Sequence, residues 1–150
     1  MMPGRRILMA LLLPAPALGQ NLGVSPPVPA LPPLPSIQLG QGVVAVPPGV
    51  WRVVFAPGRD TLDAGQRAAI GRLAAELHRG TIGRVTLLAE TSTGEDLSTH
   101  RRQSLVRGRV VREALEAGGL AATRIDIRAL GRTASARDAV DVLAPTAPRG

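Results

Sequence analysis

The sequence contains no cysteine, no lysine and no tyrosine, and its aromatic residues are a single tryptophan, Trp51, and a single phenylalanine, Phe55. Without cysteine, no disulfide can form, and a lipid anchor on a cysteine at a cleavage site is excluded. The two histidines, His78 and His100, fall short of the ligand set of a structural or catalytic zinc site. We therefore expect neither a metal nor another cofactor.

All 18 basic side chains are arginine, against 11 acidic side chains, so the formal net charge is +7. Loss of Arg5 and Arg6 with a cleaved leader would leave 7 − 2 = +5. A charge of this sign favours anionic partners. Nucleic acid is not expected among them, because two aromatic side chains cannot form the stacking platform that single-strand binders use.

Catalytic motifs are absent from the sequence. Ser92, Asp96 and His100 lie within nine positions of one another, but no G-x-S-x-G nucleophile elbow surrounds the serine and no second base lies near it. There is no phosphate-binding loop either. The sequence therefore predicts that the protein is not an enzyme.

Residues 1–19 have the features of a secretory signal peptide. "MMPGRR" is positively charged, "ILMALLL" is apolar but too short to span a bilayer, and "PAPALGQ" offers small residues for cleavage near Gly19. The other interpretation, a buried N-terminal helix, is disfavoured by Pro14 and Pro16. We expect a mature protein in the periplasm, without a transmembrane segment.

Proline marks the expected domain boundaries. Every proline lies at or before Pro57 or at or after Pro145, so helices and inner strands can form between them. Residues 20–48 are rich in proline and poor in charge, which predicts an extended linker. Whether residues 37–49 add a strand to the domain is left open. The expected domain covers residues 49–145, and residues 146–150 form a tail.

Two helices are predicted from residues at helical spacing. Asp63 and Gln66 have the spacing of a capping box at the start of the first helix, which ends near Gly80. The second helix begins around residues 96–98 and ends at Gly118-Gly119. The expected inner face of the first comprises Leu62, Ile70, Leu73 and Leu77. That of the second comprises Leu97, Leu105, Gly108, Val111 and Leu115, with a basic outer face.

Four segments have the alternating or β-branched pattern of strands: residues 50–56, 84–92, 124–131 and 138–144. The order of elements is β-α-β-α-β-β. Because strand–helix–strand connections are right-handed, both helices are expected on one face of the sheet. The predicted fold class is a two-layer α/β (α+β) sandwich, with two helices on one face of a small mixed sheet.

Two ordered sets of residues resemble a known family. The first set is Phe55, Leu62, Ile70, Leu73, Ala74 and Leu77. The second set is His100, Gln103, Ser104, Arg107, Gly108, Val111 and Leu115, followed by Gly131 and the strand "AVDV". In order and spacing, residues 50–144 resemble the OmpA-like domain family, whose second helix reads N-x-x-L-S-x-x-R-A-x-x-V-x-x-x-L. Ser104, Arg107, Val111 and Leu115 agree with that motif, whereas the Asn, Leu and Ala positions differ.

The resemblance implies non-covalent binding of peptidoglycan through the diaminopimelate of its stem peptide. In the family, the aspartate of a G-H-T-D motif takes the ligand's ammonium and the arginine of the second helix takes its carboxylate. By position the arginine is Arg107, but Ser92 replaces the aspartate and Glu90 replaces the motif histidine.

Three arrangements of the site remain open from the sequence. Glu90 lies two residues before Ser92, on the same face of a strand, and could supply the missing carboxylate. Glu95 or Asp96 could fold back instead, although Asp96 is equally suited to cap the second helix. Alternatively, the ligand has been lost and Arg107 pairs with Glu90 or Asp96.

The candidate peptidoglycan-binding residues are Glu90, Thr91, Ser92, Asp96, His100, Ser104 and Arg107. His100 could donate to a ligand or simply be exposed at the helix start. Arg101, Arg102, Arg109 and Arg112 are expected to form a solvated face that adds diffuse attraction to an anionic wall. The expected function is a peptidoglycan-binding module associated with the cell wall or outer membrane. The alternative is a protein-interaction or scaffold module of the envelope that has lost wall binding.

Overall fold

The computed structural model describes residues 43–145, so the expected signal peptide, most of the expected linker and the expected tail lie outside the described residues. Within residues 43–145 the elements are β1 (Val43–Ala45), β2 (Val50–Val54), α1 (Ala64–Gly80), β3 (Val85–Glu90), α2 (Leu97–Ala117), a 3-10 turn η1 (Ala122–Arg124), β4 (Ile125–Gly131) and β5 (Ala139–Leu143). The two helices and four strands predicted from the sequence are all present.

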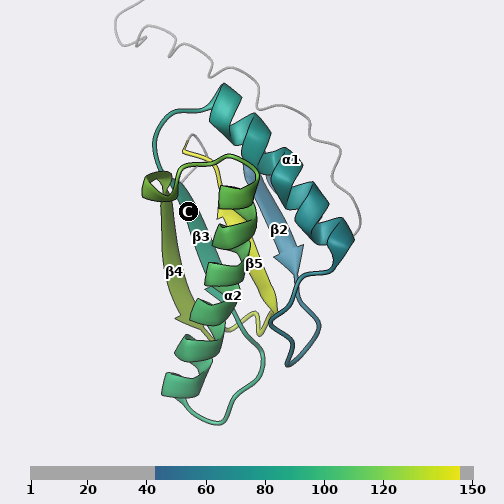
Figure 1. Cartoon of the computed structure of the whole chain (residues 1–150). Coiled ribbons are helices and arrows are strands. Elements are labelled where there is room, and N and C mark those ends of the chain that lie inside the picture. Colours follow the sequence, from purple (N-terminus) through teal and green to yellow (C-terminus); the bar gives the residue numbers. More distant parts are fainter. Residues whose placement is uncertain (1–42, 146–150) are drawn as a thin grey trace, which may run out of the picture. The chain divides into compact units, whose positions relative to one another are not determined.

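The strands form one five-stranded mixed sheet in the order β1-β2-β5-β3-β4. Among the paired strands of this sheet, only β3 and β4 run parallel to each other. The strand β5 runs antiparallel to both of its neighbours, β2 and β3. Both helices cover the same face of this sheet (Figure 1). The predicted α+β fold, with two helices on one face of a small mixed sheet, is confirmed.

The strand β1 answers the question left open for residues 37–49. It pairs antiparallel with β2 through Val43 opposite Val53 and Ala45 opposite Trp51. The turn between them is closed by the Val50 N–H, which donates to the Pro47 carbonyl at 3.0 Å, and Gly49 there has φ 83°. Glycine accommodates this φ without steric cost. The sheet therefore includes residues from the range 20–48 that was expected to be linker.

The helix α1 begins with the predicted capping box. The Gln66 N–H donates to Asp63 Oδ1 at 2.7 Å, and the Asp63 N–H donates to Gln66 Oε1 at 3.1 Å. These bonds satisfy two main-chain donors at the helix start. The predicted inner stripe of Leu62, Ile70, Leu73 and Leu77 is fully buried.

The inner face of α2 differs from the prediction at two positions. Gly108, Val111 and Leu115 are buried, but Leu105 is only half-buried and Leu97 is 61% exposed. A helix of 21 residues is about 31 Å long, whereas the seven residues of β4 span about 23 Å. The first turns of α2 therefore extend beyond the sheet (Figure 1), where no core is available to cover Leu97.

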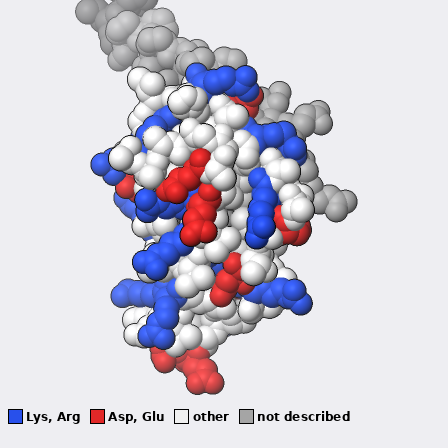
Figure 2. Space-filling model, viewed as in Figure 1, with Lys and Arg blue, Asp and Glu red and all other residues white. Residues whose placement is uncertain are grey.

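The outer face of α2 carries exposed arginines, Arg101, Arg102 and Arg109, whereas Arg112 forms an ion pair of 2.9 Å with Glu116. Figure 2 shows arginines interspersed with acidic side chains on the helix-covered face. Charges of both signs close together weaken the field of the arginines at a distance. This face is less uniformly basic than the sequence pattern predicts.

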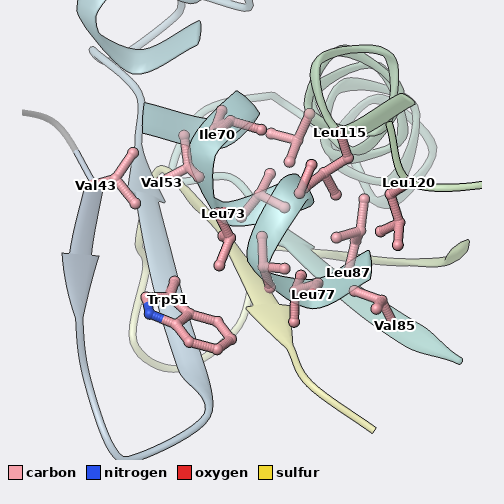
Figure 3. Close-up of a cluster of buried hydrophobic side chains, with 14 of the residues drawn as sticks. Val43, Trp51, Val53, Ile70, Leu73, Leu77, Val85, Leu87, Leu115 and Leu120 are labelled. Atoms are coloured by element: carbon pink, nitrogen blue, oxygen red, sulfur yellow. The ribbon is translucent and has the colours of Figure 1, made fainter. Parts of the chain in front are cut away.

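The core lies between the helices and the sheet and is built from aliphatic side chains together with Trp51 and Phe55 (Figure 3). Gly108 brings α2 close to β4, because a Cβ at this position would lie 2.6 Å from Ile127 Cγ2. A β-branched side chain in a strand cannot move aside easily. This contact explains why position 108 is glycine, whereas the motif of the OmpA-like family has alanine there.

Candidate functional site

The chain segments after β2, after β3 and between β4 and β5 meet at one end of the sheet, the lower end in Figure 1. Ala139, the first residue of β5, lies opposite Val54 on one side and Glu90 on the other. The residue before it, Asp138, therefore lies between the ends of two neighbouring strands. The side chain of Arg107 reaches the same place from α2.

Arg107 is the largest fully buried side chain among the described residues, with 0% of its surface exposed. Its Nη1 donates to Asp138 Oδ1 at 2.6 Å and to the Glu90 carbonyl at 3.1 Å. Its Nε donates to the Arg59 carbonyl at 3.1 Å and lies 3.3 Å from Asp60 Oδ1. The guanidinium carbon lies 5.3 Å from the centre of the Phe55 ring. Its charge is thus compensated within the protein.

Asp138 is the carboxylate partner of Arg107. Its Oδ1 also accepts the Ser92 N–H at 2.9 Å, and its Oδ2 accepts the Ser92 hydroxyl. Burial alone would raise the pKa of Asp138, but the hydrogen bonds from Ser92 and Arg107 outweigh this and hold the pKa below its ordinary value. A carboxylate therefore lies beside Ser92 and Arg107, although it comes from another loop.

Glu90 does not bind Arg107 through its carboxylate, so the alternative in which these two side chains pair is wrong. Glu90 Oε1 accepts the Thr133 hydroxyl at 2.6 Å, and Glu90 Oε2 lies 3.3 Å from Arg137 Nε. The strand alternation of β3 turns Glu90 away from the helix-covered face from which Arg107 comes. Glu90 instead holds the loop between β4 and β5, the loop that carries Asp138.

Asp96 caps α2 and does not fold back toward Arg107, so the alternative pairing of Arg107 with Asp96 is also wrong. Its carboxylate accepts the Thr99 N–H at 2.8 Å, and this hydrogen bond lowers the pKa of Asp96. Glu95 is likewise exposed. Free N–H groups at a helix start attract a nearby carboxylate strongly, which explains why Asp96 is held there.

Three further candidate residues hold the surrounding segments in place. The Thr91 hydroxyl donates to Gln103 Oε1 at 2.9 Å, and His100 Nε2 lies 2.8 Å from the Gly94 carbonyl. The Ser104 hydroxyl accepts the Gly131 N–H at 3.0 Å, which ties α2 to the end of β4. Of the seven candidates, the structure brings Ser92 and Arg107 onto one carboxylate, and Thr91 lies next to them.

The sequence does not single out Asp138 or Asp60, and it does not place Phe55 beside the guanidinium of Arg107. Position in the sequence gives little signal for Asp138, which lies 46 residues after Ser92. Its place follows from the strand order, because β5 lies between β2 and β3. Once the strand order is known, it places Asp138 beside Ser92, because the start of β5 lies next to the end of β3.

Other kinds of site have little support in the part of the chain that the structure describes. Within residues 43–145, no group of three or more His, Asp, Glu or Cys side chains could hold a metal ion. Neither helix of that range has the length and apolar content that a membrane span requires. A hollow of about 350 Å³ lies between α1 and α2 and is lined by Leu62, Val110 and Ala114 among others. It includes none of the candidate residues.

Acid should reveal how strongly Asp138 stabilises the fold. Because its pKa is lowered on folding, its contribution is complete above the ordinary pKa of an aspartate and is lost as the pH falls through the lower folded-state value. We expect Asp138→Asn to lower the free energy of unfolding at pH 7 by roughly 1–3 kcal/mol. Denaturant titrations of both proteins should show this difference shrinking below about pH 4. A difference that stays constant with pH would contradict the assignment.

The fold can be compared with those of known proteins. The sequence matches no protein-family model and no curated protein. Among solved structures, the chain is similar to the periplasmic domain of Helicobacter pylori MotB, with 13% identity, a TM-score of 0.56 and coverage of 71% of this chain and 83% of that one.

Two further solved structures have a similar fold. The peptidoglycan-associated lipoprotein of Burkholderia pseudomallei has 14% identity and a TM-score of 0.55 over 61% of this chain and 87% of that one. The cell wall anchor of the T6SS from Pseudomonas aeruginosa has 17% identity and a TM-score of 0.50 over 62% and 78%. At these identities the likeness concerns the fold, which agrees with the fold that the resemblance to OmpA-like domains implied.

Proposed function

We propose that this protein is a non-catalytic, peptidoglycan-binding module of the cell envelope, exported to the periplasm, with a proline-rich linker ahead of the domain. One observation carries the proposal: Arg107 Nη1 and both the N–H and the hydroxyl of Ser92 donate to a single carboxylate, that of Asp138. Charge-assisted donors arranged in this way recognise carboxylates. Stem peptides of the wall carry such groups, and the fold shared with a peptidoglycan-associated lipoprotein and a cell wall anchor supports the wall as the ligand.

In the proposed complex, Arg107 and Ser92 take the carboxylate of a diaminopimelate side chain. Asp138 is the substitute for the missing motif aspartate and takes the neighbouring ammonium. Thr91, His100 and Ser104 keep the surrounding backbone in place, and Glu90 positions the loop of Asp138. Asp96 acts only through the start of α2.

A second candidate function is favoured by the burial of Arg107. Since its side chain has no exposed surface and is already paired, the domain is also compatible with loss of wall recognition. In that case it acts as a protein-interaction or scaffold module of the envelope. The two candidates differ in whether a muropeptide reaches Ser92 and Arg107.

A titration of the isotope-labelled full chain with a diaminopimelate-containing muropeptide separates them. At about 150 mM salt, where attraction between distant exposed charges is screened, we expect saturable shifts at the amides of Ser92 and Asp138 and at Arg107 Nε–H. The dissociation constant should lie below about 1 mM, a binding free energy of about −4 kcal/mol.

The matched control is a double variant in the exposed arginines of α2, Arg102→Gln with Arg109→Gln. It should keep the same affinity within about twofold, because exposed charges contribute little at this salt. No shifts up to millimolar muropeptide, or shifts confined to the exposed arginines and lost with added salt, would reject wall binding at this site. The second candidate function would then be preferred.

A further inference from the structure

The donors of Arg107 and Ser92 that could bind the carboxylate of a ligand already bind the carboxylate of Asp138. The Asp138 carboxylate accepts hydrogen bonds from Arg107 Nη1 and from the N–H and hydroxyl of Ser92, and the Thr91 hydroxyl lies 3.5 Å from its Oδ1. The Asp138 side chain is 10% exposed and that of Arg107 is 0% exposed. An incoming carboxylate therefore cannot reach the donors on Arg107 Nη1 and Ser92 that face Asp138 unless Asp138 moves away.

We propose that Asp138 is an internal ligand of the Arg107–Ser92 site, and that an external carboxylate binds by displacing the Asp138 side chain. The inference rests on the proposed function only for the identity of the external ligand, a stem peptide. The position itself suits an anionic acceptor such as a carboxylate, since the groups of Arg107 and Ser92 that contact Asp138 are all donors.

The main chain around Asp138 allows its side chain to leave without disturbing the sheet. The Asp138 carbonyl accepts the Phe55 N–H at 2.8 Å, and the next residue, Ala139, is paired in β5. The backbone is therefore held independently of the carboxylate. The preceding residues 134–137 are exposed, so the space toward which the side chain would turn lies at the surface.

Arg107 would not be left without compensation during the exchange. Asp60 Oδ1 lies 3.3 Å from Arg107 Nε, and the Phe55 ring faces the guanidinium. The displaced Asp138 carboxylate and Asp60, whose side chain is 37% exposed, would both be close to an ammonium group on the same ligand. A zwitterionic ligand should therefore displace Asp138 better than a simple carboxylate does.

Chemical rescue tests the internal ligand without assuming any wall ligand. In the full chain, Asp138→Ala removes the carboxylate and leaves its donors in place. We expect sodium acetate to raise the melting temperature of this variant by about 5 °C relative to sodium chloride at equal ionic strength, while the wild type shows no such difference. The control Asp126→Ala removes a carboxylate from the exposed pair with Arg84 and should show no acetate effect. Absence of rescue in a folded Asp138→Ala protein would overturn the proposal.

A second variant covers the case in which Asp138→Ala does not fold. Asp138→Asn keeps the volume of the side chain but holds Arg107 less tightly. Acetate carries no ammonium that Asp138 could hold, so it should bind this variant at least about tenfold more tightly than it binds the wild type. Equal or weaker binding by this variant would overturn the proposal. Acetate rescue of Asp138→Ala with no muropeptide binding by any variant would retain the internal ligand and reject peptidoglycan as its competitor.

Discussion

Replacing Arg107 with alanine should lower the free energy of unfolding by roughly 3–5 kcal/mol, the range for breaking a buried ion pair from one side. Solvent screening should reduce this loss of stability only slightly, because the Arg107 and Asp138 side chains are 0% and 10% exposed. The variant removes the Arg107 donors from the Glu90 and Arg59 carbonyls and from the Asp138 carboxylate, which keeps only neutral donors such as those of Ser92. Since small domains have only about 5–15 kcal/mol of stability in total, denaturant unfolding should show a large shift of the midpoint.

Two controls separate the ion pair from other effects of the Arg107 change. Arg109→Ala removes an exposed arginine from the same helix and should cost less than about 0.5 kcal/mol. The double variant Arg107→Ala with Asp138→Ala should cost less than the sum of the single changes, because each single change strands the other charge. A cost below about 1 kcal/mol for Arg107→Ala would contradict the observed burial and pairing.

The second large effect is expected at the glycine pair that ends α2. Gly118→Ala should destabilise the domain by roughly 3 kcal/mol, the upper end of the range for overpacking. A Cβ on Gly118 would lie 2.7 Å from the Ala74 Cβ and 2.8 Å from the Cα and carbonyl oxygen of Gly71. These are mostly main-chain atoms of α1, so the two helices would have to move apart.

Gly119 provides the matched comparison for Gly118. It has φ 106°, and a Cβ there would meet nothing within 4 Å. Gly119→Ala should therefore cost only the backbone strain, about 1–2 kcal/mol. Thermal or denaturant unfolding of the two variants should rank Gly118→Ala as the less stable protein. The reverse order would show that α1 and α2 are not held in this close contact.

Arg107 is the one charged residue on the buried face of α2. Arg107 follows the same inward stripe as Gly108, Val111 and Leu115. Its charge is tolerated there because Asp138 and Asp60 lie beside it and main-chain carbonyls accept its N–H groups. The residue therefore stabilises the domain in addition to its proposed role in binding, and loss of binding in an Arg107 variant has to be interpreted together with a stability measurement.

The sequence by itself determined the fold class and the local structure. Apolar periodicity and turn residues placed both helices and four strands, and the capping box at Asp63 was correct to the residue. These features depend on contacts between residues close in the chain, so their pattern can be read directly. Leu97 was misplaced because helical spacing alone does not tell where the sheet beneath the helix ends.

The composition of the site was decided only by the tertiary structure. The sequence indicates Arg107 as a residue that holds a carboxylate, and it offers Glu90 and Asp96 as internal partners because they lie close along the chain. The observed partner, Asp138, lies 31 residues from Arg107. It comes beside Ser92 because β5 is inserted antiparallel between β2 and β3, with Ala139 opposite both Val54 and Glu90. Strand order depends on packing of the whole sheet, and no local pattern of residues specifies it.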